Sequence, residues 1–417
     1  MPPTRARYSV LALVFFAAVI TYLDRVCISV AAPAMQRDLG LTQFQFSWVF
    51  TAFYLAYTIF EMPASWLGDR WGQRTTMIRI VGCWSIFTVL TGVARTYPML
   101  LVTRFVFGAG EAGAFPTLSR AISRWFPIDA RSRANGLMWT GARFGGAVSP
   151  ALAVAAMVWI GWRGAFALFG ALGLIWVAIW AWWFRDDPAQ HPAVNQAELA
   201  EIQHGVAPPP KRGEPVPWRR LLLDRDLLML CCTYFASGFG FQFFVTWLPT
   251  YLNKEHGQSL MRSGLYSSLP LLAGAAGCLV GGMLADYTTR RTGSLLWGRR
   301  SVGAGGFLLG AVGFVAAINA GSAETAIASL VLASGAHDMI LPVLWASCTD
   351  IGGRFGGTAS GWVNLASSLS GMTAPLASAW LSDAFGTFTG VFYVAAALYI
   401  FSGALWLIID PRRREIS

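Results

Sequence analysis

Residues 65–74 read SWLGDRWGQR, and residues 282–291 read GMLADYTTRR. Both segments follow a long apolar stretch, and an aspartate stands at the same place in each. A second match, ANG at 134–136 and ASG at 359–361, recurs at nearly the same spacing along the chain. Each match is short, but their common spacing indicates that the chain consists of two copies of one structural unit.

The composition is that of a protein surrounded by lipid. Of the 417 residues, 55% are apolar and only 12% are charged, which is about half the charged share of an ordinary soluble domain. So few polar side chains could not cover a core that holds 19 tryptophans and 28 phenylalanines. Disorder, a collagen-like fibre and a disulfide scaffold are excluded, because the six cysteines lie in apolar stretches without framework spacing. A multi-pass membrane protein remains.

Twelve apolar stretches are long enough to cross a bilayer, which takes about 20 residues as a helix. They are 8–33, 45–66, 75–95, 98–121, 134–157, 163–184, 225–252, 260–285, 301–319, 323–347, 357–380 and 387–410. The loops on the side of the N-terminus hold 23 Lys and Arg residues, and those on the other side hold five. Because Lys and Arg accumulate on the cytoplasmic face, we expect both termini in the cytoplasm.

The fold class predicted is therefore an all-α membrane protein with twelve transmembrane helices in two pseudo-symmetric six-helix bundles. The longest polar stretch, roughly 185–224, has six spans before it and six after it. It contains three consecutive prolines and several charges but no sustained apolar face, which is typical of a flexible linker. We place the N-terminal bundle at 1–190, the cytoplasmic linker at 191–222 and the C-terminal bundle at 223–417.

The repeated loops resemble the signature of the major facilitator superfamily, a Gly-x-x-x-Asp-Arg-x-Gly-x-Arg-Arg pattern found in both halves. The first copy has Ser65 where glycine is usual, and the second has Tyr287 and Thr289 in place of the Arg and the second Gly. Four further segments resemble the anion:cation symporter family within that superfamily. They are YLDR (22–25), RFVFGAGEAGAFP (104–116), TWLPTYL (246–252), and DIGGR (350–354) with GWVN (361–364).

This resemblance covers essentially the whole chain and implies transport of a small organic anion. The family includes bacterial permeases for sugar acids, tartrate and phthalate-like acids, and animal carriers of sialic acid and glutamate. The implied mechanism is proton-coupled symport by alternating access, with the substrate site near the middle of the membrane. The alternative is a proton-coupled exporter or antiporter of organic anions or drugs with the same fold. Arginines inside the spans count against cationic drugs as its cargo.

Ionisable groups inside spans are candidate site residues, because an unpaired charge in lipid is costly. Arg104 matches the anion-binding arginine of the family, and its planar guanidinium can donate two parallel hydrogen bonds to a carboxylate. Arg143 either contacts a second acidic or hydroxyl-bearing group of the substrate or packs between helices. Four neutral polar residues are predicted to orient the ligand: Tyr22, Tyr54, Gln242 and Asn364.

Asp24 and Glu111 match the proton-carrying carboxyls of the family. When both are protonated, the nearby arginines leave a surplus of positive charge, so proton binding and anion binding favour each other. Arg25 either holds Asp24 ionised in one conformation or has a structural role. Arg104 and Glu111 share a helix face but lie about 10 Å apart, which is too far for direct contact. The alternative is that both acids form permanent salt bridges with Arg25 and Arg104.

Two further groups of polar residues have roles that the sequence leaves open. Asp338 can pair with Arg143 or with His337, and His337 is either a proton relay or a packing residue. The repeated loops are predicted to form a conformational latch at the cytoplasmic helix ends; solvated turns are the alternative. The latch residues are Asp69, Arg70, Arg74, Asp286 and Arg290.

Other classes of function find no support in the sequence. HExxH and CxxC motifs, a Ser-His-Asp order and a large soluble loop are all absent, so we expect no enzymatic activity, no cofactor and no metal. The arginines are scattered rather than gathered in a basic domain, which argues against nucleic acid as a partner. The predicted partners are the organic anion, protons and the lipid bilayer, and sodium in place of protons stays open. Compact loops without an Asn-x-Ser/Thr site favour a bacterial inner membrane, and we expect a monomer.

Overall fold

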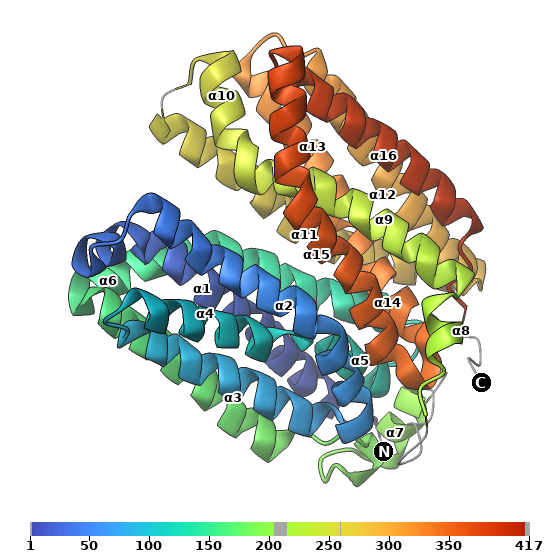
Figure 1. The fold of residues 1–417 in the computed structure, drawn as a ribbon. Coiled ribbons are helices and arrows are strands. Elements are labelled where there is room, and N and C mark those ends of the chain that lie inside the picture. Colours follow the sequence, from blue (N-terminus) through green and yellow to red (C-terminus); the bar gives the residue numbers. More distant parts are fainter. Residues whose placement is uncertain (1, 204–214, 259, 413–417) are drawn as a thin grey trace. The chain divides into compact units, whose positions relative to one another are not determined.

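The computed structural model describes residues 2–203, 215–258 and 260–412. The described residues form helices and connecting loops, which confirms the prediction of an all-helical fold (Figure 1). The elements before the polar stretch are α1 (Ala6–Leu39), α2 (Gln43–Trp71), α3 (Gln73–Gly92), α4 (Tyr97–Glu111), α5 (Ala114–Trp125), α6 (Arg131–Trp183), η1 (Pro188–Gln190) and α7 (Gln196–Gln203). Those after it are α8 (Trp218–Leu222), α9 (Arg225–Gln242), η2 (Phe243–Trp247), α10 (Leu248–His256), α11 (Leu260–Thr292), α12 (Leu295–Ile318), α13 (Ala323–Asp338), α14 (Ile340–Gly352), η3 (Gly353–Phe355), α15 (Gly356–Phe385) and α16 (Thr389–Ile408).

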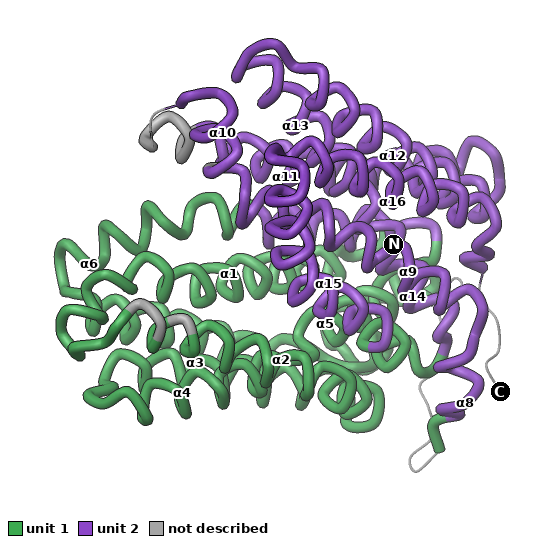
Figure 2. Tube along the Cα trace, turned by 45° about the horizontal axis from the view of Figure 1, so that its top comes forward, with its two compact units in different colours: residues 1–128, 144–216, 354–361 green, residues 129–143, 217–353, 362–417 purple. Residues whose placement is uncertain are grey.

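The chain divides into two compact units, which Figure 2 shows in different colours. Unit 1 consists of 1–128, 144–216 and 354–361, and unit 2 consists of 129–143, 217–353 and 362–417. In unit 1, α4 packs against α2 and α3; in unit 2, α12 packs against α13 and α16. Helices α6 and α15 each contribute residues to both units, because the division falls within them.

Eight helical segments of the described chain are long and apolar enough to cross a membrane. Two of them, 131–183 and 323–385, are 53 and 63 residues long. As a helix, 53 residues extend about 80 Å, whereas the hydrocarbon core is about 30 Å thick. The longer segments therefore have room for two crossings each, and both are interrupted. Within α6, Gly161 has φ 70°, a left-handed conformation that glycine adopts without a steric penalty.

Close helix packing rests on small residues, as the glycine spacing predicts. A Cβ atom added to Gly108 of α4 would collide with the backbone carbonyl of Phe53 on α2. In unit 2, one added to Gly277 of α11 would collide with the carbonyl of Gly335 on α13. Glycine at these positions lets the helix backbones approach each other directly.

Helix α7 lies inside the stretch predicted to be a flexible linker, and it holds the start of α1. The carboxylate of Glu198 accepts hydrogen bonds from the backbone N–H groups of Ala6 and Arg7, both at 3.1 Å, and from the Thr4 hydroxyl at 2.6 Å. A carboxylate at this place accepts hydrogen bonds from the otherwise unpaired N–H groups at the helix N-terminus. Its negative charge also interacts favourably with the positive end of the helix dipole. The three prolines of the linker lie outside the described residues.

Candidate functional site

Four charged residues of unit 1 lie on two helices, α1 and α4. Asp24, Arg104 and Glu111 are buried, with exposed fractions of 1%, 2% and 0%, and Arg25 is partly buried. Asp24 and Arg25 stand in the middle of α1, while Arg104 and Glu111 stand two turns apart on α4. Helix periodicity places the α4 pair on one face, which turns both side chains toward the interior of the unit.

Arg25 forms an ion pair with Glu111, to which its Nε donates a hydrogen bond. In this conformation Arg25 is therefore bonded to Glu111 rather than to Asp24. Consecutive residues on a helix point about 100° apart, so Arg25 reaches across to α4 rather than to its neighbour. Its guanidinium also lies over the rings of Tyr57, at 4.8 Å, and Phe53, at 5.3 Å.

Arg104 has no carboxylate partner among the described residues. Its Nε and Nη1 atoms are buried without hydrogen-bond partners in that part of the chain. The guanidinium lies 4.2 Å from the ring centre of Phe107 and 5.4 Å from that of Phe53. A buried cation that is held by aromatic faces and retains free N–H donors provides the chemistry that binds a carboxylate.

Asp24 lies in the same neighbourhood. Its carboxylate forms no ion pair within the described chain. Glu111 and Arg104 act on it through space, and the indole of Trp84 is its hydrogen-bonding neighbour. The salt bridge that forms joins Arg25 to Glu111, and among the described residues Arg104 is bridged to neither acid.

The two tyrosines predicted to orient a ligand lie beside this cluster. Tyr22, Tyr54 and Tyr57 are all close enough to Arg25 to interact with it electrostatically. Tyr22 also packs edge to face on Phe115, at 6.4 Å between ring centres. Sequence reasoning missed Tyr57. The sequence could have indicated Tyr57 by its position three residues after Tyr54, which places the two side chains on the same helix face.

In unit 2, Arg143 and Asp338 form a buried bidentate ion pair. Arg143 donates from Nε to Asp338 Oδ2 at 2.7 Å and from Nη2 to Oδ1 at 2.8 Å. His337 Nε2 lies 3.3 Å from Asp338 Oδ1, and its Nδ1 lies 2.8 Å from the Tyr399 hydroxyl. Asp338 therefore contacts both of the partners that the sequence left open. The Arg143 guanidinium already holds a carboxylate, whereas Arg104 has donors without partners among the described residues. The two arginines are therefore not equivalent candidates for binding an anion.

Gln242 and Asn364, the other predicted ligand-orienting residues, also belong to unit 2. Gln242 is the last residue of α9, and the π-helical turn η2 follows it at once. The Thr246 hydroxyl donates to the Gln242 backbone carbonyl, which fits the altered hydrogen bonding of such a turn. Asn364 lies on α15 and is 8% exposed.

The carboxylate of the first repeated loop holds the start of α15. Asp69 accepts hydrogen bonds from the N–H groups of Gly357, at 3.1 Å, and Thr358, at 2.6 Å, and from the Thr358 hydroxyl at 2.8 Å. Its cationic partner is Arg120 of α5, at 3.4 Å. Sequence reasoning missed Arg120 because it lies on another helix.

Arg70 and Arg74 have other contacts. The Arg70 guanidinium lies over the ring of Trp66, at 5.3 Å. The Arg74 backbone N–H donates to Asp186 Oδ1 at 2.9 Å, and its side chain donates to the carbonyl of Ala181. These contacts hold the start of α3 against the end of α6.

The second repeated loop makes a similar contact with the first turn of α6. Asp286 Oδ2 accepts a hydrogen bond from the Arg133 backbone N–H at 3.0 Å. Arg290 lies 3.9 Å from Asp129, and both of these side chains are exposed. Across the described residues, no group of three or more His, Cys, Asp or Glu side chains is placed to hold a metal ion.

The chain is similar in sequence and in fold to known proteins. Residues 14–296 and 292–417 match the family model described as Major Facilitator Superfamily. The fold is similar to the crystal structure of the transporter FucP in the outward conformation, with a TM-score of 0.78 and 16% sequence identity. That match covers 97% of this chain and 100% of FucP.

Two curated relatives match nearly end to end. The chain is 35% identical to the probable sulfoacetate transporter SauU of Cupriavidus necator, over 98% of this chain and 94% of that protein. It is 30% identical to the D-galactonate transporter of Escherichia coli, over 98% of this chain and 96% of the relative. These matches agree with the family resemblance noted in the sequence motifs.

Proposed function

The chain belongs to the major facilitator superfamily, and on that premise we propose that this multi-pass membrane protein imports a small organic anion together with protons. The observation that carries the proposal is the buried guanidinium of Arg104, which has free donors and no ion-pair partner among the described residues. Two buried carboxyls, Asp24 and Glu111, lie in the same unit. An anion-binding group and groups that can carry protons therefore occur together.

Arg104 binds the carboxylate or another acidic group of the substrate in this proposal. Its planar fork matches the two oxygens of a carboxylate and stays charged at any physiological pH. Phe53 and Phe107 hold the guanidinium in place. Tyr22 and Tyr54 supply hydroxyl groups for the rest of the ligand, and Gln242 and Asn364 are candidates for the same role.

Asp24 and Glu111 couple the anion to protons. Protonation of Asp24 removes a negative charge near Arg104, so the anion binds more tightly to the protonated protein, and by linkage the bound anion favours protonation. Protonation of Glu111 releases Arg25 from its ion pair. The two carboxyls thus respond to a proton in different ways, since only Glu111 is paired within the described residues.

The proposed topology has twelve spans with both termini in the cytoplasm. Two of the eight apolar segments have room for a pair of spans each, and α2 together with the broken helix α4–α5 supplies two more. The proposed division is 1–190, 191–222 and 223–417, and the two bundles alternate access to the substrate. Bacterial relatives and compact loops support the bacterial inner membrane as the location.

The substrate class follows from the chemistry of Arg104 and from the names of the relatives. One relative is named for sulfoacetate and another for D-galactonate. Both compounds are small organic anions with a carboxylate that an arginine fork can hold. A small hydroxy acid, sugar acid or sulfonated acid is therefore the proposed cargo.

The test uses purified protein in sealed proteoliposomes and a panel of monocarboxylic, dicarboxylic, sugar and sulfonated acids, with sulfoacetate and D-galactonate included. A thermal-shift screen first identifies an acid that binds. An inward proton gradient is then expected to drive its accumulation, and Arg104→Gln is expected to abolish binding. The matched control is Arg37→Gln, which removes an exposed arginine at the end of α1. Accumulation driven only by sodium, or full binding by Arg104→Gln, would contradict the proposal.

A further inference from the structure

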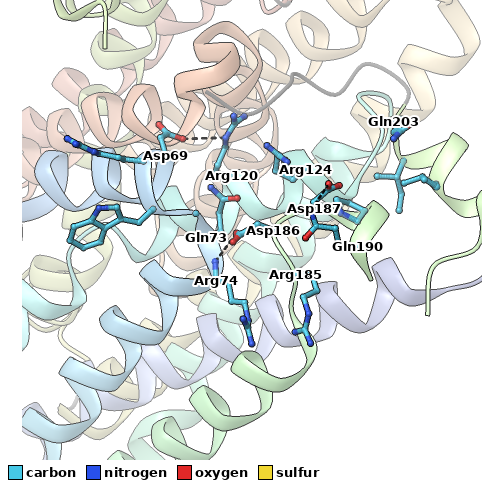
Figure 3. A pocket seen from close by; sticks show the side chains of 16 residues that line it. Asp69, Gln73, Arg74, Arg120, Arg124, Arg185, Asp186, Asp187, Gln190 and Gln203 are labelled. Carbon is cyan, nitrogen blue, oxygen red and sulfur yellow. Dashed lines mark hydrogen bonds and ion pairs between the residues drawn. The ribbon is translucent and has the colours of Figure 1, made fainter. Parts of the chain in front are cut away.

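A separate polar pocket lies in unit 1, at the end that carries the N-terminus. Its volume is about 720 Å³, and residues of α2, α3, α5, α7 and the loop after α6 line it (Figure 3). This volume is within the range of small-molecule sites, roughly 300–1,000 Å³. None of the residues assigned to anion transport on α1 and α4 lines this pocket.

The lining carries more positive than negative charge. Five arginines and three aspartates face the pocket, which leaves an excess of two positive charges. The aspartates already have partners: Asp69 holds α15, Asp186 accepts from the Arg74 N–H, and Asp187 accepts from the Ala189 N–H at 3.0 Å. Burial raises the pKa of the Asp186 carboxyl, while the Arg74 N–H and the neighbouring arginines favour its charged form.

Arg124 is the buried arginine whose donors are available in this pocket, whereas Arg70 is exposed and lies over the Trp66 ring. Arg120 pairs with Asp69 and Arg185 donates to backbone carbonyls. The Arg124 side chain is only 9% exposed, yet its Nε is buried without a hydrogen-bond partner. Asp186 and Asp187 act on it through space, but no ion pair of Arg124 is formed in the described chain. Figure 3 shows its guanidinium at the pocket, near Asp187.

We propose that this pocket binds a phosphate group, with Arg124 as its main ligand. A guanidinium fork donates two parallel hydrogen bonds to phosphate oxygens. A phosphate monoester carries a charge of about −1.5 to −2 at neutral pH, which balances the excess of two positive charges; a lipid phosphodiester carries less charge and balances it in part. The phosphate belongs either to a soluble metabolite or to a lipid headgroup, because the pocket chemistry serves both.

The binding test uses the full-length protein carrying Arg104→Gln, so that the proposed transport site does not contribute. Inorganic phosphate is titrated in nanodiscs of phosphatidylcholine, and the same nanodiscs with added phosphatidylglycerol form the lipid arm. Phosphate binding in phosphatidylcholine indicates a soluble ligand. Stabilisation by phosphatidylglycerol without a phosphate response indicates a lipid headgroup.

In either arm, Arg124→Gln is expected to weaken binding at least tenfold, Arg124→Lys to weaken it less, and the exposed Arg37→Gln to leave it unchanged. Asp187→Asn provides a second test, because asparagine can still cap η1 while one negative charge facing the pocket is removed. Asp187→Asn is expected to tighten phosphate binding about threefold, because it removes a negative charge that repels the phosphate through a screened Coulomb interaction. Binding that is absent in both arms, or that is insensitive to Arg124 and Asp187, overturns the proposal.

Discussion

Asp69 and Asp286 make equivalent contacts in the two repeats. Each carboxylate accepts a backbone hydrogen bond from the third residue of a helix, Thr358 of α15 at 2.6 Å and Arg133 of α6 at 3.0 Å. The two helices also carry the second sequence match, ANG at 134–136 and ASG at 359–361. Both repeated motifs therefore belong to one repeated structure, in which a carboxylate satisfies the free N–H groups of a helix N-terminus.

Replacement of these two aspartates by alanine is expected to have unequal effects. Asp69→Ala removes the acceptor of three hydrogen bonds and leaves Arg120 without its carboxylate, whereas Asp286→Ala removes the acceptor of the hydrogen bond from the Arg133 N–H. Hydrogen bonds to a charged group contribute about 1.5–3 kcal/mol each and are not additive. The thermal midpoint is therefore expected to fall further for Asp69→Ala. Substrate affinity, measured by titration, is expected to stay the same while the uptake rate falls; equal midpoints would contradict this ranking.

Arg104→Lys tests the geometry of anion binding separately from its charge. Lysine keeps the positive charge but cannot donate two parallel hydrogen bonds from a planar group. We expect the dissociation constant of the transported acid to rise about tenfold, equivalent to about 1.4 kcal/mol. Isothermal titration of the purified protein measures it. An unchanged constant would mean that Arg104 acts only as a distant charge.

Asp24→Asn is expected to uncouple transport from protons. The variant keeps Arg104 and the Arg25–Glu111 pair, so it is expected to bind the acid and to exchange it across the membrane. It is not expected to accumulate the acid under an inward proton gradient, because the carboxyl near Arg104 no longer titrates. Counterflow and gradient-driven uptake in the same proteoliposomes separate these two activities.

Glu111→Gln is expected to lose gradient-driven uptake as well, but with an additional loss of stability. Glu111 is buried and paired with Arg25, so its neutralisation leaves that cation without a partner. Its thermal midpoint is expected to lie below that of Asp24→Asn, because Asp24 has no ion-pair partner among the described residues. If both variants accumulate substrate normally, the assignment of proton coupling to these carboxyls is wrong.

A double-mutant cycle tests the buried pair in unit 2. Arg143→Gln leaves the Asp338 carboxylate without its bidentate partner, and loss of one member of such a pair costs about 3–5 kcal/mol. The double variant Arg143→Met with Asp338→Leu is expected to recover most of this stability, since no unpaired charge remains. Thermal unfolding of the parent protein, Arg143→Met, Asp338→Leu and the double variant gives the coupling. If the double variant also binds a monocarboxylate normally, Arg143 does not contact that substrate.

The loop after α6 is expected to weaken in acid because of His191. Its Nε2 lies 3.0 Å from the Trp183 carbonyl, and its Nδ1 accepts from the Ala193 N–H at 3.2 Å, so the neutral ring fits both contacts. Burial lowers the pKa of His191 below its usual range. As the pH falls, His191 therefore binds a proton in the unfolded chain before it does so in the folded protein. The free energy of unfolding decreases as the pH falls below about 6.5. His191→Gln is expected to reduce the loss of thermal midpoint between pH 7.5 and pH 5.5.

The sequence by itself determined where helices form and which charged residues lie within them as candidates for the site. An apolar run of about 20 residues is a local property, and in lipid the backbone must satisfy its own hydrogen bonds, so each run becomes helical whatever surrounds it. Ionisable residues within such runs are costly wherever they face. For this reason Asp24, Arg104 and Glu111 were identifiable without a structure.

Only the tertiary structure decided which charges pair. Arg25 binds Glu111 on another helix rather than its neighbour Asp24, and Asp69 binds Arg120 rather than Arg70. Ion pairs depend on side-chain direction and on which helices pack together, and neither is encoded in the local spacing of apolar residues. The same reason hid Arg124, because its lack of an ion-pair partner among the described residues is a property of the folded pocket.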